Sequence, residues 1–278
     1  MTTPILEPET RQDAQGDSAK RFGWITITVA IVGGMVVAGT LTSAVFNNLR
    51  DVMRAETTIT QSVSGVSSLR VDVESVGMQI QFGDVSEAEL RVETRGFKPA
   101  SEWQLVAEGG ELSVERASGS RGGAGFGDEE LSLTLPKSIE GEDLDAQITV
   151  SSGAATVEGD FGDVVLETSS GASNFDGSAA NLTATTGSGA SNIDAEVAGE
   201  VVLSASSGAL NVELGDVTPK STEISLESGF ASVSMPDGPY KVEKNLSESG
   251  SADISVRQSD TAKNTLSISV GSGYVTIE

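Results

Sequence analysis

The sequence predicts an all-β protein, a parallel β-solenoid (β-helix-like) ectodomain preceded by one transmembrane α-helix. Three observations support this fold class. An uncharged apolar segment lies near the N-terminus, apolar and polar residues alternate through much of the remaining chain, and a glycine-containing repeat begins near Leu144. Composition agrees with it: of 278 residues 32 are Gly and only 4% are aromatic, which disfavours a Leu- and Phe-rich helical globule.

Composition also excludes several classes of function. The chain has no Cys and no His, so it lacks cysteine nucleophiles, disulfides, the usual zinc ligands and Ser-His-Asp triads. Its 41 acidic and 17 basic residues give a net charge of −24. That charge repels phosphates, so we expect no nucleic-acid partner.

The N-terminal segment predicts a membrane anchor. Residues 22–46 carry no charge and follow Lys20 and Arg21; this length crosses about 30 Å of hydrocarbon. Residues 1–21 are then a short, disordered cytoplasmic tail and residues 47–62 a juxtamembrane linker. The basic pair favours a single-pass plasma-membrane protein with an extracellular C-terminal domain. A cleaved signal peptide is the alternative, because small residues follow the apolar stretch.

One face of the predicted helix carries small residues at every fourth position. Such a stripe permits close approach of two helices, so a helix-mediated homo-oligomer is one expectation. The other is that small residues are simply common in spanning helices. The stripe consists of Thr26, Ala30, Gly34, Ala38 and Thr42.

Residues 63–137 predict a strand-rich lead-in that caps one end of the solenoid. Apolar and polar residues alternate in 71–74, 111–115 and 131–135, the pattern of half-buried strands. Two glycines at 109 and 110 predict a hairpin turn between strands. The glycine-rich segment 121–127 predicts a loop.

Residues 138–278 predict the solenoid repeats. A glycine recurs at intervals of 18 to 23 residues; the residue four positions beyond it is apolar every time, and the residue five positions before it is apolar in all but one case, Asn245. One repeat therefore reads as strand, glycine corner, strand and loop, and it needs its neighbours to bury its apolar side. We expect the last strand, 274–278, to close the far end. The repeat glycines are Gly153, Gly171, Gly189, Gly208, Gly229, Gly250 and Gly273.

These glycines have a predicted backbone role. At a coil corner, a residue with a Cβ atom would either have to adopt a left-handed conformation or collide with the neighbouring coil.

The chain resembles a known bacterial family. Residues 131–137, Leu-Ser-Leu-Thr-Leu-Pro-Lys, followed by Leu144 and by Ile-Thr-Val-Ser-Ser-Gly at 148–153, are similar to the signature of a family labelled "putative adhesin", a domain of unknown function on envelope proteins. The resemblance covers about residues 63–278. It implies a surface-exposed binding or structural role and supplies no catalytic residues.

A column of carboxylates is the one predicted metal site. The residues five positions beyond four consecutive repeat glycines are acidic, and coils in register would place them about 4.8 Å apart. Such a column either holds calcium, the one cofactor considered, or forms a solvated acidic face. The residues are Glu158, Asp176, Asp194 and Glu213.

A polar ladder is expected beside this column. The position three beyond the glycine holds Thr156, Asn174, Asn192, Asn211 and Ser232, and stacked Asn side chains bond to one another along a solenoid. A structural role is favoured over ligand binding.

An enzyme that uses carboxylates alone, such as a polysaccharide lyase or hydrolase, is disfavoured. Asp160 with Asp163, or Asp176 with Asp194, could flank a glycosidic bond. Carbohydrate clefts, however, are lined by aromatic and basic side chains, and the central repeats offer only Phe161 and Phe175 and no Arg.

These features together predict a non-enzymatic, membrane-anchored cell-surface protein whose adhesin-like solenoid acts as a binding or scaffold module. The expected partner is an envelope or extracellular protein or a glycan. The alternative is an envelope structural or stress-associated protein that works with a membrane partner through the helix stripe.

Overall fold

The computed structural model describes residues 54–96, 102–116, 127–141 and 143–278. These residues form strands and one short 3₁₀ helix, η1 (Lys137–Ile139), so the predicted all-β class is confirmed. No helix among the described residues is long and apolar enough to span a membrane. The predicted anchor at 22–46, its small-residue stripe and most of the glycine-rich loop at 121–127 lie outside the described ranges.

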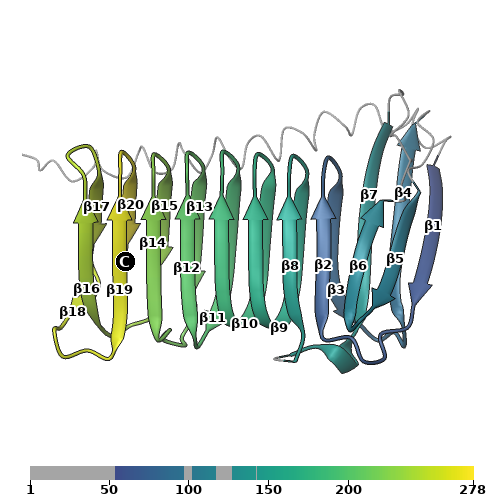
Figure 1. The fold of residues 1–278 in the computed structure, drawn as a ribbon, viewed down its shortest axis with the longest axis horizontal. Coiled ribbons are helices and arrows are strands. Elements are labelled where there is room, and N and C mark those ends of the chain that lie inside the picture. The colour runs from purple at the N-terminus through teal and green to yellow at the C-terminus, as the bar shows by residue number, and fades with distance from the viewer. Residues whose placement is uncertain (1–53, 97–101, 117–126, 142) are drawn as a thin grey trace, which may run out of the picture. The chain divides into compact units, whose positions relative to one another are not determined.

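The described chain forms a β-solenoid in which each coil contributes one strand to each of two facing sheets (Figure 1). In each coil from β8–β9 onward, a first-sheet strand leads through the glycine corner into a second-sheet strand. In spatial order, the first sheet contains β5 (Trp103–Glu108), β6 (Glu111–Arg116), β2 (Ser68–Val73), β8 (Asp145–Val150), the second halves of β9 (Ala154–Thr168) and β10 (Ala172–Thr186), β12 (Glu200–Ala205), β14 (Ser221–Leu226), β19 (Asn264–Val270) and β16 (Pro239–Leu246).

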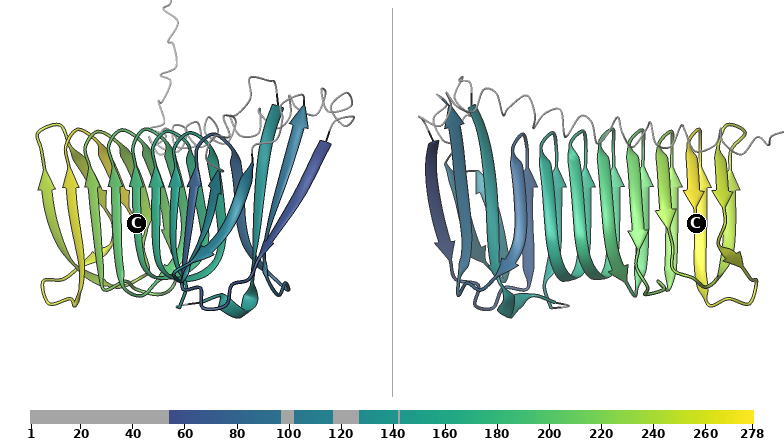
Figure 2. Two further views of the ribbon diagram at one scale, coloured as in Figure 1. Left: turned by 45° about the vertical axis from the view of Figure 1, so that its right-hand side comes forward. Right: turned by 180° about the vertical axis from the view of Figure 1, so that it is seen from behind.

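The second sheet faces the first across the core (Figure 2). Its order is β1 (Arg54–Gln61), β4 (Ala88–Gly96), β7 (Gly127–Pro136), β3 (Gly77–Gly83), the first halves of β9 and β10, β11 (Ala190–Val197), β13 (Ala209–Leu214), β15 (Phe230–Ser234), β20 (Tyr274–Ile277) and β17 (Ser251–Ile254). The two-residue β18 (Arg257–Gln258) pairs with the start of β16. Pairing is parallel from β2 and β3 onward and antiparallel in β1–β4–β7 and β5–β6.

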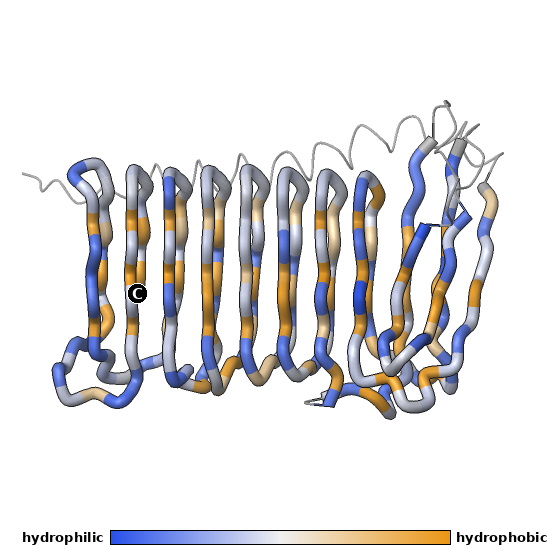
Figure 3. The backbone as a smooth tube through the Cα atoms, viewed as in Figure 1, coloured by the Kyte–Doolittle hydropathy of each residue, from blue (hydrophilic) through white to orange (hydrophobic). Residues whose placement is uncertain are grey.

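The core lies between the two sheets. Apolar and polar residues alternate along each strand (Figure 3), and the inward positions of successive coils pair in register, so each buried side chain packs against its counterpart in the next coil. The apolar position five before each glycine is one such column, as the repeat predicts. Its buried members are Ile148, Leu166, Ala184, Leu203, Ile224 and Ile268.

The order of the coils departs from the order of the sequence at both ends. The coil β2–β3 lies between β6–β7 and β8–β9, so part of the predicted lead-in is a complete solenoid coil. At the other end, β19–β20 lies between β14–β15 and β16–β17. The prediction that 274–278 closes the solenoid is therefore wrong. The chain forms the outermost coil, β16–β17, first, and its last coil, β19–β20, then inserts between that coil and β14–β15.

The outermost coil explains the one exception in the repeat. In β16, Lys244 occupies the register position of the buried Ile268, and Asn245 pairs with the outward-facing Ser269. Lys244 and Leu246 are both exposed, because no coil covers them among the described residues. A charged side chain at an inward register position discourages further strand addition.

The corner glycines are required by close approach and not by a left-handed backbone. None of the seven has a positive φ, so the first of the two predicted reasons is wrong. A Cβ atom on Gly171 would lie 2.2 Å from the carbonyl oxygen of Gly153, and one on Gly189 would lie 2.3 Å from that of Gly171. Among the glycines that do have a positive φ, Gly159 and Gly177 lie at the opposite corner of the coils, with φ values of 134° and 152°.

Candidate functional site

The candidate site is a groove on the outer surface of the second sheet. It has a volume of about 480 Å³ and crosses the strands from β9 to the C-terminal residue. Because neighbouring strands are parallel and in register, residues at equivalent repeat positions form rows that run along the solenoid. The groove is lined by Thr156, Glu158, Asn174, Phe175, Asp176, Asn192, Ile193, Asp194, Asn211, Val212, Glu213, Ser232, Ser234 and Glu278.

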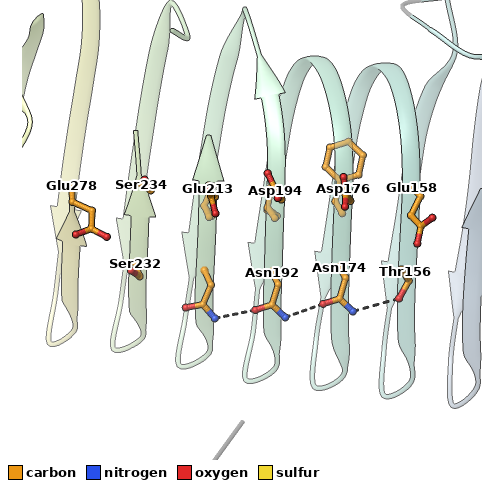
Figure 4. A pocket seen from close by; sticks show the side chains of 14 residues that line it. Thr156, Glu158, Asn174, Asp176, Asn192, Asp194, Glu213, Ser232, Ser234 and Glu278 are labelled. Carbon is orange, nitrogen blue, oxygen red and sulfur yellow. Dashed lines mark hydrogen bonds between the residues drawn. The ribbon is translucent and has the colours of Figure 1, made fainter. Parts of the chain in front are cut away.

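The first row, the amide row, is the predicted polar ladder. Asn192 donates from Nδ2 to Asn174 Oδ1 at 2.9 Å, and Asn211 Nδ2 donates to Asn192 Oδ1 at 3.0 Å. Asn174 Nδ2 reaches Thr156 Oγ1 at 3.5 Å (Figure 4). Register extends the row to Ser232 and beyond. The amides therefore bond to one another along the row, and each remains at least partly exposed at the groove surface.

The second row, the carboxylate row, contains the predicted column. Glu158, Asp176, Asp194 and Glu213 pair in that order across neighbouring strands, and all four are exposed. Ser234 follows in register, and Glu278 lies next to it (Figure 4). No basic residue lines the groove. Within the described ranges, no group of three or more acidic side chains is placed to hold a metal ion; calcium binding and a solvated acidic face stay the two predicted alternatives.

The third row contains the residues directly after the corner glycines, together with Gly77, which is in register with them but follows Val76. It begins with Gly77 and small alanines and then changes character: Phe230 and Tyr274 are neighbours in register, with ring centroids 6.1 Å apart and ring planes 18° apart. These residues are 39% and 40% exposed. We call them the aromatic pair. The whole row is Gly77, Ala154, Ala172, Ala190, Ala209, Phe230, Tyr274 and Ser251.

The aromatic pair was missed in the sequence, although a signal was present. Each aromatic residue directly follows a repeat glycine, at a position that holds Ala in four other repeats. The two aromatics considered there, Phe161 and Phe175, are instead buried in the core, where they contact each other and Phe82. Aligning every repeat at the residue after the glycine would have found the pair.

The other acidic residues considered for catalysis lie apart from the groove and act in hydrogen bonds between coils. Asp160 accepts from Ser178 Oγ at 2.7 Å, and Asp163 accepts from Asn181 Nδ2 at 2.7 Å. Asp145 in turn accepts from the backbone nitrogen of Asp163 at 2.8 Å. These carboxylates therefore stabilise the stacking of coils near the corner that joins the two sheets.

The groove therefore offers hydrogen-bonding amides and hydroxyls and exposed carboxylates, and the aromatic pair lies beside it on the same outer face of the sheet. Its strands, β9 to β20, each have a partner on both sides. This pairing holds the rows on a rigid backbone, which suits recognition by pre-placed side chains.

Solved structures are similar to this chain at low sequence identity, and the first of the two described here supports the fold. A protein described as a "putative adhesin" from Bacteroides fragilis is 14% identical, covers 81% of this chain and 97% of its own, and has a TM-score of 0.50. A "putative lipid binding protein" from Parabacteroides distasonis is 15% identical, covers 81% and 96%, and has a TM-score of 0.49. No curated protein matches the chain significantly.

Sequence comparison assigns the family more directly. The match to the Toastrack DUF4097 family extends over residues 66–278, that is, from just before β2 to the C-terminal residue. The predicted resemblance to a family of adhesin-like domains of unknown function is confirmed. With its two-sheet solenoid and its match over most of the sequence, the chain belongs to the Toastrack DUF4097 family.

Proposed function

We propose that the protein is a non-enzymatic binding module held at the outer face of the plasma membrane, with residues 22–46 as its anchor and the groove of the second sheet as its contact surface. The observation that carries this proposal is the groove itself: amide and carboxylate residues form continuous rows on strands that are paired on both sides. A rigid sheet with aligned, exposed polar side chains is suited to binding an extended partner.

The membrane location rests on sequence. Residues 22–46 are uncharged and follow Lys20 and Arg21, which favours a cytoplasmic N-terminus and an external solenoid. The name of the Bacteroides fragilis neighbour, a "putative adhesin", agrees with a surface role.

The non-enzymatic part of the proposal rests on chemistry. The sequence has no Cys or His, and Asp160 and Asp163 accept hydrogen bonds from neighbouring coils. The carboxylates that remain in the groove form a row with no basic or nucleophilic partner among the lining residues other than the hydroxyl groups.

The test has two parts, both with the full chain. A C-terminal epitope tag should be accessible to antibody on intact cells, and deletion of 22–46 should abolish retention in the membrane fraction. Binding of the cells to envelope or extracellular material should then fall when Asn192→Ala is combined with Asp194→Ala in the groove. The matched control, Thr185→Ala with Glu223→Ala, changes exposed residues on the first sheet and should leave binding unchanged.

Three kinds of outcome would contradict the proposal. An inaccessible tag on intact cells would overturn the external location. Equal loss of binding in the groove variant and its control, or no loss in either, would remove the groove as the contact surface. If Gly34→Leu with Ala38→Leu abolishes function while the groove variant does not, the alternative role through a membrane partner replaces this one.

A further inference from the structure

The aromatic pair is the most exposed apolar feature of the second sheet. Phe230 and Tyr274 are two of the four large apolar or aromatic residues that are exposed among the described residues. Their neighbours in the row, Ala209 and Ser251, are too small to cover the rings. Exposed aromatic side chains side by side on a rigid sheet are typical of contact surfaces, since stacking on them costs little side-chain entropy.

The pair lies beside one end of the polar groove, on strands that continue the groove's rows. On β15, Phe230, Ser232 and Ser234 alternate on the outer surface; on β20 and the C-terminal residue, Tyr274, Thr276 and Glu278 do the same. Ser232 and Thr276 are in register and extend the amide row. A ligand stacked on the rings would therefore place its polar groups beside hydroxyl, amide and carboxylate side chains.

Charge restricts the class of ligand. The groove is lined by five carboxylates and by no basic residue, and the sequence between Lys137 and Lys220 contains no Lys or Arg. Anionic polymers, including nucleic acids and uronic-acid chains, are repelled by such a surface. Carboxylates and amides hydrogen-bond well to hydroxyl groups, so hydroxyl-rich, uncharged ligands are suitable partners.

The pairing of the strands argues against an extended peptide. Peptides that bind to sheets commonly add a strand at a free edge, where the backbone supplies the affinity. Every strand beneath the groove, from β9 to β20, already has a partner on each side. Recognition here must rely on side chains, as it does for sugars.

We propose that the groove binds an extended, uncharged glycan chain, with one sugar ring stacked on Phe230 or Tyr274 and the following sugars hydrogen-bonded along the amide and carboxylate rows. This inference rests on the proposed function and names the class of ligand for that same groove. The apolar face of a sugar ring matches an exposed aromatic ring, and its hydroxyl groups match the polar side chains next to it.

Binding to soluble probes tests the assignment. Full-length protein, in a detergent without a sugar headgroup, is titrated calorimetrically with uncharged hexasaccharides of glucose, mannose and N-acetylglucosamine, with an oligogalacturonate and with hexalysine. We expect at least one uncharged hexasaccharide to bind and the oligogalacturonate not to bind. Phe230→Ala with Tyr274→Ala should weaken that binding at least about tenfold, the loss typical of aromatic anchors.

Matched variants separate stacking from stability. Phe230→Tyr and Tyr274→Phe keep the rings and should retain affinity within about twofold, since stacking is the dominant contact. Leu246→Ala removes an equally exposed apolar side chain, 40% exposed, from β16 of the first sheet and should not change binding. Unfolding midpoints of all variants show whether each one is folded.

The outcomes distinguish this inference from the proposed function. If hexalysine binds in the groove and no hexasaccharide does, the glycan assignment is wrong while the binding module stands. The same holds if a glycan binds but the double alanine variant binds it equally well, because the site then lies elsewhere. If no probe binds at all, the glycan assignment is overturned, and the cell-binding assay with the groove variant decides the proposed function separately.

Discussion

Phe230 and Tyr274 stack on neighbouring strands although the whole coil β16–β17 separates them in the chain. Their ring centroids are 6.1 Å apart because β19–β20 returns inside β16–β17 and pairs with β14–β15. Without that return, Phe230 would lie beside Ser251, which pairs instead with Tyr274. The unusual order of coils at the C-terminal end therefore creates the aromatic pair that lies beside the binding groove.

The corner glycines provide the first prediction. Gly171→Ala would place a Cβ atom 2.2 Å from the carbonyl oxygen of Gly153, so the two coils would have to separate, at a cost of about 1–3 kcal/mol in unfolding free energy. Gly77→Ala is the matched control, because its Cβ atom would have a single contact, at 3.9 Å, with Glu130. We expect it to change stability by less than about 0.5 kcal/mol. Denaturant unfolding measures both, and equal losses would show that the close contact between coils does not set the cost.

The carboxylate row provides the second prediction. Asp194 lies between Asp176 and Glu213 in register, and like charges opposite one another in a sheet are destabilising. Asp194→Asn should therefore raise the unfolding midpoint slightly at low salt, and the gain should shrink as salt screens the row.

The same variant tests the calcium alternative. We expect millimolar calcium to shift the wild-type midpoint no more than a control of equal ionic strength, because the described residues contain no group of acidic side chains placed around a metal ion. A calcium-specific rise that Asp194→Asn abolishes would contradict this and establish a cation site, since an ion that binds only the folded state stabilises it.

The repeat was predictable because the structure of a solenoid coil depends mainly on residues that are close together in the sequence. Inward columns such as Leu166, Ala184 and Leu203, and outward rows such as Asn174 and Asn192, depend only on strand alternation and repeat length. Once the glycine spacing is seen, the register of the coils and the neighbours of each side chain in the central region follow.

The ends were not predictable in the same way, because their coil order depends on long-range pairing. Nothing in the spacing between Gly229 and Gly250 says that Gly273 will lie next to Gly229, as it does. The presence of Lys244 at a core register position indicates an outermost coil. This can be recognised only when β16 has been aligned with β19. The aromatic pair could not be predicted for the same reason, because it depends on the pairing of β20 with β15.

Tyr240 provides a prediction on pH. Its ring is fully buried and its hydroxyl group donates to the carbonyl oxygen of Pro236 at 2.8 Å. Burial raises the pKa of Tyr240 above its ordinary value of 10.0; a hydrogen bond with Thr218 partly opposes this, and the charge of Asp237 adds to it.

The sign of the effect follows from that direction. Because the folded protein holds the phenol proton more tightly than the unfolded chain, this contribution to stability is complete below pH 10 and is lost as pH rises through the raised pKa, by at most about 1.4 kcal/mol per pH unit. Tyr240→Phe should remove this part of the alkaline loss and cost about 0.5–1.5 kcal/mol at neutral pH through the missing hydrogen bond. Unfolding free energies of both proteins from pH 8 to 11.5 measure the difference. The control variant Tyr274→Phe, at an exposed ring, should show the same dependence of unfolding free energy on pH as the wild type. If Tyr240→Phe also shows the wild-type dependence, the assignment to Tyr240 is wrong.

Lys244 provides the last prediction, on association. It occupies the register position of the buried Ile268 on the outermost strand of the first sheet, beside the exposed Leu246. Lys244→Leu would complete an apolar stripe at that end and remove the charge that discourages strand addition. We expect concentration-dependent association of the full chain beyond that of the wild type, measured by analytical ultracentrifugation in one detergent. Asn245→Leu adds the same apolar group at an outward position, in register with Ser269, and should associate less. If both variants associate equally, general surface hydrophobicity is responsible and Lys244 does not protect the end.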